Sequence, residues 1–249
     1  MKKILLGGLV VLLALFVVGC GMSSGDEDVS GSKYDKTWEK ENNTVNYLRF
    51  YEQFGTSKKV TYAKVKMTIS NPEKSRAGLI FGMNKNAEDS DLVDYFILGV
   101  GSFDSLDGPG YYLDYHKGVD PEVLSAASGA ENLDASDVTS IKATAAFDTA
   151  QAPVMGSDGS MTVYASVDID EDGKFTVSLG ATKDNLPVIV ANGLALSTYD
   201  TDADPAAPGG IGCYGMVFPG DTGTGTATKT TNRYTVVDSK PAPTSLSAE

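Results

Sequence analysis

Three aspartates at alternate positions form the clearest metal-binding pattern in the chain. The segment Asp168-Ile169-Asp170-Glu171-Asp172-Gly173 matches the first half of a calcium loop, D-x-D-x-D-G, in which carboxylates converge and glycine permits the sharp turn. The twelfth position of such a loop is Leu179, so the usual bidentate glutamate is missing. The flanking residues alternate as strands do, and Asp-Gly between such flanks is a strong hairpin signal. Two interpretations stay open: a plain hairpin, and a Ca²⁺ site at Asp168, Asp170 and Asp172.

Two further acidic segments have similar chemistry. Asp200-Thr201-Asp202-Ala203-Asp204 repeats the alternate-carboxylate pattern, and Glu88-Asp89-Ser90-Asp91 follows an apolar stretch that ends at Met83. Charge runs are usually solvated, so we interpret the first as an acidic surface loop. If two of these acidic loops meet at one end of the fold, they would supply a calcium site.

A cluster of aromatic residues is the best candidate for ligand contact. In an extended chain, Tyr111, Leu113 and Tyr115 share one face, and the other face carries Tyr112, Asp114 and His116. Tyrosine combines a flat apolar ring with a polar tip, which suits the C–H faces and hydroxyl rims of sugars. We predict that the first set is core and that Tyr112, Asp114 and His116 bind a ligand. The alternative is ordinary strand aromatics, since tyrosine is enriched in strands whatever their function.

The first twenty residues predict export. Lys2 and Lys3 precede an uncharged run from Ile4 to Val18, which is shorter than the roughly 20 apolar residues of a membrane span and is typical of a secretory signal. The segment Val17-Val18-Gly19-Cys20 resembles the lipobox of bacterial lipoproteins, where cleavage falls before the cysteine. The resemblance implies a signal peptide over residues 1–19 and a lipid, palmitate among its acyl chains, on Cys20. Two or more acyl chains anchor a protein stably in a membrane.

The same resemblance implies an address in the bacterial cell envelope, and glycine rather than aspartate after Cys20 favours the outer membrane. The alternative is a cleaved signal without lipid. Residues 20–33 are rich in Gly, Ser and Asp and form a flexible tether by composition. The membrane is therefore an expected partner of the chain through its lipid anchor.

Composition excludes several classes of function. The chain has 249 residues and a formal net charge of −13, which becomes −15 once Lys2 and Lys3 leave with the signal, so nucleic acid is not an expected partner. There are two cysteines, Cys20 and Cys213, and if Cys20 carries lipid, Cys213 has no intramolecular partner. We expect Cys213 to be a buried small apolar residue. One histidine and two cysteines also exclude cysteine-rich zinc sites and histidine-rich metal sites.

Period-two patterning predicts one all-β domain over residues 34–239, followed by an unstructured tail over 240–249. Strands are expected over residues 60–69, 77–83, 95–101, 110–115, 139–147, 161–169, 174–181, 211–218 and 232–238. The stretches 77–83 and 95–101 are apolar on both faces, which indicates central strands. The best helical segment, 121–128, makes about two turns. This pattern predicts a two-sheet antiparallel sandwich or jelly roll.

The order of core motifs resembles the concanavalin A-like jelly rolls of the laminin-G or glucanase kind. The resemblance rests on Ala77-Gly78-Leu79-Ile80-Phe81-Gly82, Asp94-Tyr95-Phe96-Ile97-Leu98-Gly99-Val100, Gly110-Tyr111-Tyr112-Leu113 and the late Gly210-Ile211-Gly212-Cys213-Tyr214-Gly215. It implies the fold first, and carbohydrate recognition as a common use of that fold.

Catalysis is not favoured by any motif. The string Asp168 to Asp172 lacks the E-x-D-x-x-E order of retaining glucanases, and the chain has no G-x-S-x-G elbow and no phosphate-binding loop. The sequence therefore predicts a membrane-anchored lipoprotein whose sandwich binds a glycan or another envelope or host component without catalysis. A glycoside hydrolase-like enzyme and a structural or assembly lipoprotein, which would bind a protein, are the alternatives.

Overall fold

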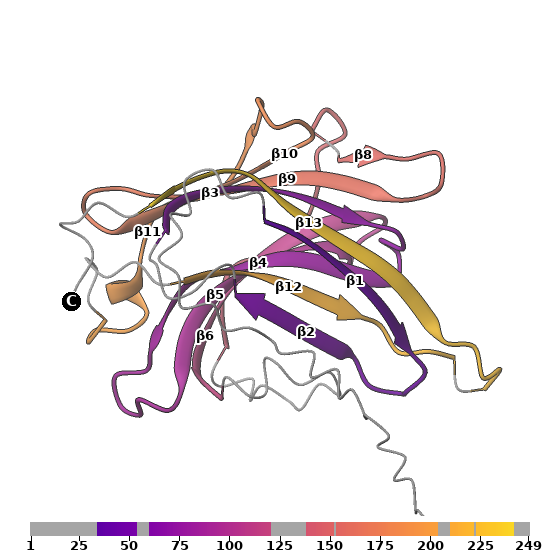
Figure 1. Ribbon diagram of the computed structural model, residues 1–249, viewed down its shortest axis with the longest axis horizontal. Coiled ribbons are helices and arrows are strands. Elements are labelled where there is room, and N and C mark those ends of the chain that lie inside the picture. Colours follow the sequence, from indigo (N-terminus) through magenta and orange to yellow (C-terminus); the bar gives the residue numbers. More distant parts are fainter. Residues whose placement is uncertain are drawn as a thin grey trace, which may run out of the picture.

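Two antiparallel β-sheets packed face to face form the protein (Figure 1). The computed structural model describes residues 34–53, 60–120, 138–151, 153–203, 210–221 and 223–241. This confirms the expected all-β, two-sheet antiparallel sandwich of jelly-roll type. Cys20, the signal and tether segments, the helical segment 121–128 and the tail beyond residue 241 lie outside the described residues.

The upper layer in Figure 1 is a seven-stranded sheet with the order β1-β13-β3-β9-β10-β11, in which β8 pairs with β9. Its strands are β1 (Asp35–Asn42), β3 (Val60–Ile69), β8 (Val154–Met155), β9 (Met161–Ile169), β10 (Lys174–Gly180), β11 (Val188–Ala195) and β13 (Thr228–Pro241).

The lower layer is a six-stranded sheet with the order β2-β12-β4-β5-β6-β7. Its strands are β2 (Leu48–Gln53), β4 (Ser75–Lys85), β5 (Val93–Ser102), β6 (Pro109–Val119), β7 (Val138–Ala146) and β12 (Gly210–Val217). Strands β4 and β5 are central in this sheet and buried on both faces, as their unbroken apolar sequences predict.

The main core lies between the sheets and follows the alternation of each strand. On β3, Ala63, Val65, Met67 and Ile69 are all buried, while the residues between them are partly exposed. On β6, the inward set Tyr111, Leu113 and Tyr115 belongs to this core, as expected. Cys213 of β12 is also in it, which confirms the prediction of a buried cysteine.

A second apolar cluster covers the outer face of the six-stranded sheet. It contains nine buried residues: Ile80, Tyr95, Ile97, Phe103, Tyr112, Val119, Tyr214, Met216 and Phe218. We call it the outer cluster. The strands β4, β5 and β12 of this sheet are therefore buried on both faces, whereas the seven-stranded sheet turns polar side chains outward.

Side chains at the open edge of the sandwich tie the two sheets together. The indole of Trp38 on β1 packs edge-on against Phe50 on β2, with ring centroids 4.6 Å apart, and also contacts Tyr234. The amide of Asn232 on β13 donates to the carbonyl of Arg76 on β4 at 2.9 Å. The Trp38–Phe50 and Asn232–Arg76 contacts cross from one sheet to the other, so they fix how the layers pack on each other.

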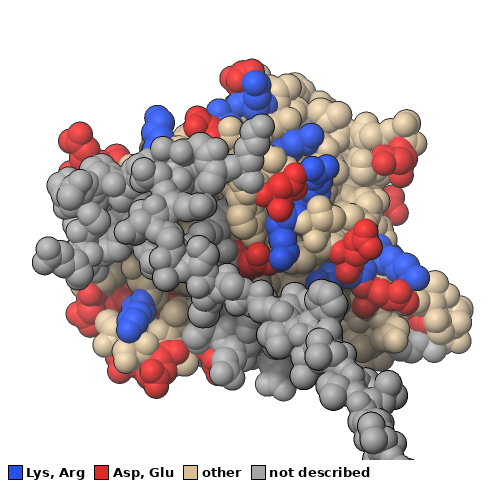
Figure 2. All heavy atoms as spheres, viewed as in Figure 1, with Lys and Arg blue, Asp and Glu red and all other residues tan. Residues whose placement is uncertain are grey.

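Surface charges of both signs are interspersed over the described part of the face shown in Figure 2. Several of them pair, for example Arg233 with Asp35 and Lys229 with Glu41. Exposed pairs of this kind contribute little to stability, because water and salt screen them. Within the described residues, no helix has the length and hydropathy to span a membrane.

Candidate functional site

Three turns meet at one end of the sandwich because strand pairing brings their ends together. Ile69 at the end of β3 pairs with Met161 at the start of β9, so the turn after β3 lies beside the β8–β9 hairpin. Arg76 at the start of β4 pairs with Gly101 near the end of β5, so the β5–β6 turn joins them. The sheet register therefore sets this convergence.

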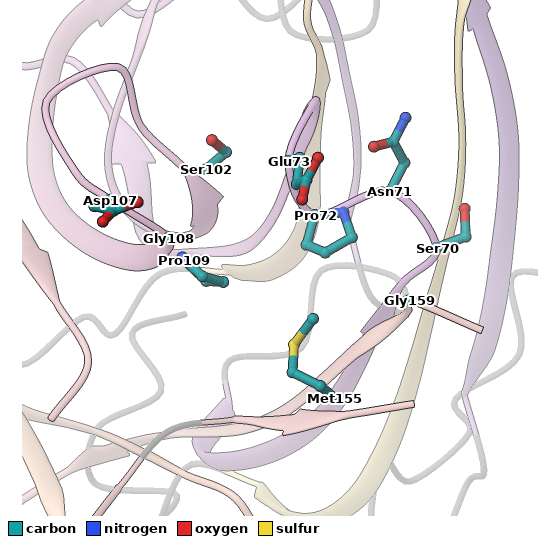
Figure 3. Close-up of a pocket in the computed structure, with 10 residues that line it drawn as sticks. All are labelled: Ser70, Asn71, Pro72, Glu73, Ser102, Asp107, Gly108, Pro109, Met155 and Gly159. Atoms are coloured by element: carbon teal, nitrogen blue, oxygen red, sulfur yellow. The ribbon is translucent and has the colours of Figure 1, made fainter. Parts of the chain in front are cut away.

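A groove of about 590 Å³ lies between these turns (Figure 3). Its size falls within the range of small-ligand sites, roughly 300–1,000 Å³. The side chain of Met155 points from β8 toward Pro72 and Pro109. The residues that line the groove are Ser70, Asn71, Pro72, Glu73, Ser102, Asp107, Gly108, Pro109, Met155 and Gly159.

Each turn is held by its own hydrogen bonds. In the first, the amide of Lys74 donates to the carbonyl of Asn71 at 3.2 Å, and the Asn71 side chain donates to the carbonyl of Lys229 at 2.9 Å. In the β8–β9 hairpin, the amide of Gly156 donates to the carbonyl of Ser160 at 2.7 Å. Gly159 there has a φ of 81°, a conformation that favours glycine. The groove is thus lined by positioned backbone rather than by long free loops.

The chemistry of the groove is mixed. Met155 and Pro109 offer apolar surface, and Ser70, Asn71 and Ser102 offer hydroxyl and amide groups. Two exposed carboxylates, Glu73 and Asp107, come from separate turns. Apolar walls with a few convergent polar groups are the usual composition of small-molecule sites.

The predicted ligand-binding residues of β6 lie elsewhere, on the outer face of the six-stranded sheet. Tyr112 and His116 are buried, and Asp114 is partly buried. The ring of Tyr112 packs against the ring of Phe103, with their centroids 5.4 Å apart. The guanidinium of Arg76 lies over the ring of Tyr112. The structure therefore places all three on one face, as alternation predicts. Their contact with a ligand stays a prediction.

Burial shifts the ionisation of this face. Desolvation, together with the nearby positive charge of Arg49, lowers the pKa of His116 to about 4. Neither ring nitrogen of His116 has a hydrogen-bond partner among the described residues. Desolvation also raises the pKa of Asp114, although a hydrogen bond from Ser140 opposes the shift. At neutral pH, His116 is therefore an uncharged imidazole.

The calcium-like motif spans the end of β9, where Asp168 lies, and the turn of the β9–β10 hairpin, where Asp170 and Asp172 lie. The carboxylate of Asp170 accepts hydrogen bonds from the amides of Asp172 and Lys174, at 3.0 and 2.9 Å. Gly173 takes a φ of 74° in the turn. These observations confirm the hairpin interpretation. No group of three or more His, Cys, Asp or Glu placed to hold a metal occurs among the described residues, and a Ca²⁺ site at Asp168, Asp170 and Asp172 stays a prediction.

Asp200 departs from the expected solvated loop, whereas Thr201 and Asp202 after it are exposed as expected. The side chain of Asp200 is buried, with 5% exposed. The short 3₁₀ helix η2 (Leu196–Thr198) ends just before it, and Tyr199 packs on the ring of Tyr115 with centroids 5.2 Å apart. Because the Tyr199 ring packs on the core, the next residue, Asp200, is buried as well. The acidic composition of the segment does not predict this.

The groove residues were not predicted as a site. The dipeptides Asn71-Pro72, Asp158-Gly159 and the segment Asp107-Gly108-Pro109 signal turns, and all three are turns here. Which turns become neighbours depends on strand order and register, which local composition does not encode. The sequence signal that could have indicated the groove is the presence of three turns with Pro or Gly at the ends of predicted strands.

No protein-family model matches the chain, and neither does any curated protein. Among solved structures, it is similar to a xylan β-1,4-xylosidase from Bacillus halodurans C-125, with 11% identity and a TM-score of 0.33, over 76% of this chain and 32% of that one. It is also similar to the β-porphyranase BpGH16B from the human gut bacterium Bacteroides plebeius, with 6% identity and a TM-score of 0.29, over 78% and 75% of the two chains. The chain spans about a third of the xylosidase's length. Similarity at this level carries no information on ligand or activity.

Proposed function

We propose that the protein is an exported, lipid-anchored β-sandwich that binds a glycan in the groove, without catalysis. The observation that carries this proposal is the groove itself, an open space of about 590 Å³ with apolar and polar walls at one end of the fold. A sugar ring has C–H faces and hydroxyl rims, so it needs both kinds of wall. Acidic net charge and the mixed surface charges of Figure 2 offer no comparable basis for binding a polyanion.

The two sides of the groove would divide the work of recognition. The side chain of Met155 and the ring of Pro109 supply adaptable and flat apolar contact for the C–H face of a sugar. Carboxylates such as Glu73 and Asp107 accept strong hydrogen bonds from hydroxyls. Burying a hydroxyl without a partner is costly, so these polar groups would select the orientation of the sugar.

Anchoring completes the proposal and rests on the sequence of residues 1–20. With the lipid on Cys20, the sandwich would be tethered to a bacterial membrane. Glycine after Cys20 favours the outer membrane. Fully extended, residues 20–33 span at most about 50 Å. A glycan of the same envelope, or one on a neighbouring surface, would then lie within reach of the groove.

A glycan array with a matched pair of variants tests this function. Val154 and Met155 are neighbours on β8 and each is 51% exposed, but only Met155 lines the groove. The wild type should bind a defined set of glycans, Met155→Asp should lose at least tenfold in affinity for them, and Val154→Asp should bind as the wild type does. Binding to no glycan, or equal loss in both variants, would exclude the groove as a glycan site.

A hydrolase is the second candidate, because Glu73 and Asp107 line the same groove. Glycoside hydrolysis uses two carboxyl groups on either side of the scissile bond. Release of reducing ends from an array-selected glycan, abolished in both Glu73→Gln and Asp107→Asn, would establish it. Intact glycan after prolonged incubation with the wild type would leave binding as the function.

A further inference from the structure

Two buried carboxyl groups meet at the end of the sandwich opposite the groove. Asp94 lies near the start of β5, whose far end at Ser102 lines the groove, a separation on the order of 27 Å along the strand. Asp94 is 2% exposed and Asp200 is 5% exposed. Their carboxyl groups interact directly, which adds to the effect of burial in raising the pKa of Asp94.

Hydrogen bonds and ring packing hold the pair in place. One oxygen of Asp94, Oδ1, accepts from the side-chain amide of Asn86 at 2.9 Å and from the backbone amide of Gly118 at 2.6 Å. Asp200 accepts from the amide of Asp202 at 3.1 Å. The ring of Tyr199 packs against Phe96 as well as Tyr115, so the residue before Asp200 is fixed on the core.

Two buried oxygens at this point make no hydrogen bond to a described residue. Oδ2 of Asp94 is buried without a hydrogen bond, and so is the hydroxyl of Tyr115, which interacts with both carboxyl groups. Buried polar atoms are nearly always paired, so two orphan oxygens at one point indicate a missing partner. The Tyr115 hydroxyl belongs to neither acidic segment and is an observation independent of the carboxylates.

Lys117, whose charge interacts with both carboxyl groups, does not neutralise the pair. The ammonium of Lys117 pairs instead with Glu88 at 3.3 Å, and its side chain is 37% exposed, so its charge stays in contact with solvent. Two buried carboxylates without a buried cation are strongly unfavourable, because the charges lose hydration and repel each other. A bound cation removes both costs.

We propose that Asp94 and Asp200, with the hydroxyl of Tyr115, bind a Ca²⁺ ion. Calcium is a hard cation that takes oxygen ligands, carboxylates above all, in a flexible geometry. The carboxylates supply charge and the tyrosine oxygen a neutral ligand. The only histidine of the chain lies on the outer face of the sheet and the only described cysteine lies on β12, so a softer metal finds no ligand of its kind here. Asp200 begins one acidic segment of the sequence, and Asp94 lies three residues after the acidic segment Glu88 to Asp91. The fold brings these two segments to one end of the sandwich.

Thermal unfolding of the full-length protein in detergent tests the site. After removal of metal with EDTA, Ca²⁺ at about a hundredfold excess over its dissociation constant should raise Tm by roughly 5–10 °C. Asp200→Asn should abolish this shift, and in EDTA it should unfold no earlier than the wild type because one of two repelling charges is gone. Asp172→Asn removes an equal charge from the calcium-like hairpin and should leave the shift intact.

Terbium luminescence gives a second readout that stability does not affect. Tb³⁺ substitutes for Ca²⁺ and is sensitised by a coordinating tyrosine, so Tyr115→Phe should remove most of a saturable, Ca²⁺-competed signal. The proposal is overturned if the wild type shows no Ca²⁺-dependent shift in Tm, if the shift persists in Asp200→Asn, or if it disappears in Asp172→Asn. In the first case the carboxyl groups share a proton instead.

Discussion

The imidazole of His116 stacks flat on the ring of Tyr95, with centroids 5.0 Å apart and planes 6° from parallel. Both side chains are buried in the outer face of the six-stranded sheet, and the two ring nitrogens and the Tyr95 hydroxyl have no hydrogen-bond partner among the described residues. Burial of the imidazole, more than the nearby charge of Arg49, explains why a histidine outside the main core is uncharged at neutral pH.

The ionisation of His116 gives a clean test of this packing, because the chain has one histidine. Its pKa of about 4 lies below the ordinary value of 6.5, so its NMR resonances should titrate near pH 4 and not near pH 6.5. A normal titration would show that the ring is hydrated and that the stack does not form in solution.

The same shift makes stability depend on pH. Between pH 6.5 and 4 the unfolded chain takes up a proton at His116 and the folded chain does not, so folding weakens by roughly 3 kcal/mol as pH falls through this range. His116→Phe keeps the stacked ring and cannot be protonated. Its stability advantage over the wild type, measured by urea unfolding, should grow from pH 7 to pH 4.5, and a constant difference would contradict the shifted pKa.

The ring of Tyr112 lies close to the backbone of Gly99, so we expect substitution of this glycine to destabilise the fold. A Cβ on Gly99 would lie 2.3 Å from the Tyr112 ring, so Gly99→Ala should overpack the outer cluster and cost about 1–3 kcal/mol in unfolding free energy. In a Tyr112→Leu background the added methyl has room, and the cost should fall. Equal costs in both backgrounds would show that Tyr112 does not lie over β5.

The side chain of Asn232 bridges the two sheets, so we expect its removal to lower the free energy of unfolding substantially. Its side chain is fully buried, donates to the Arg76 carbonyl, and accepts from the Thr230 hydroxyl at 3.0 Å. Asn232→Ala removes both hydrogen bonds from a buried site. The Thr230 hydroxyl keeps its bond with the Ser75 hydroxyl, but the Arg76 carbonyl loses its side-chain donor, so we expect a loss of about 2–3 kcal/mol in chemical unfolding. Thr37→Ala on the exposed face of β1 should stay within about 0.5 kcal/mol. Similar effects of the two variants would argue against the bridge.

Thiol counting tests the lipid on Cys20. Cys213 is fully buried, and burial raises the pKa of its thiol, so the native protein should show no fast-reacting thiol. In guanidinium, the membrane-derived protein should titrate one thiol per chain, because a thioether at Cys20 does not react. Two thiols would show an unmodified Cys20, and Cys213→Ala should titrate none.

Apolar alternation made much of the fold predictable. The expected strand over 60–69 is β3 and that over 161–169 is β9, each with the same bounds. Strand β1 was not expected because its sequence, Asp-Lys-Thr-Trp-Glu-Lys-Glu-Asn, has no apolar alternation. It is an edge strand whose one large apolar side chain, Trp38, is partly buried. Strand β13 runs to Pro241, past the expected domain end at 239, because its polar end still pairs with β3.

The sites were less predictable, because they depend on contacts between distant segments. Asp94 sits inside an apolar strand sequence, and nothing in its neighbours shows that Asp200 lies beside it. The groove needs the register Ile69–Met161 to place Met155 near Pro72. Alternation predicted which face Tyr112 and His116 take, but not that side chains such as Tyr95 and Tyr214 would pack there and bury them.

Hydrogen–deuterium exchange with an array-selected glycan tests glycan binding in the groove most directly. Bound glycan should slow exchange in the three turns around Asn71, Asp107 and Gly159, and leave the Asp170–Gly173 hairpin at the other end of β9 unchanged. Protection confined to β6 around Tyr112, or no protection in the three turns at saturating glycan, would contradict the assignment of the groove.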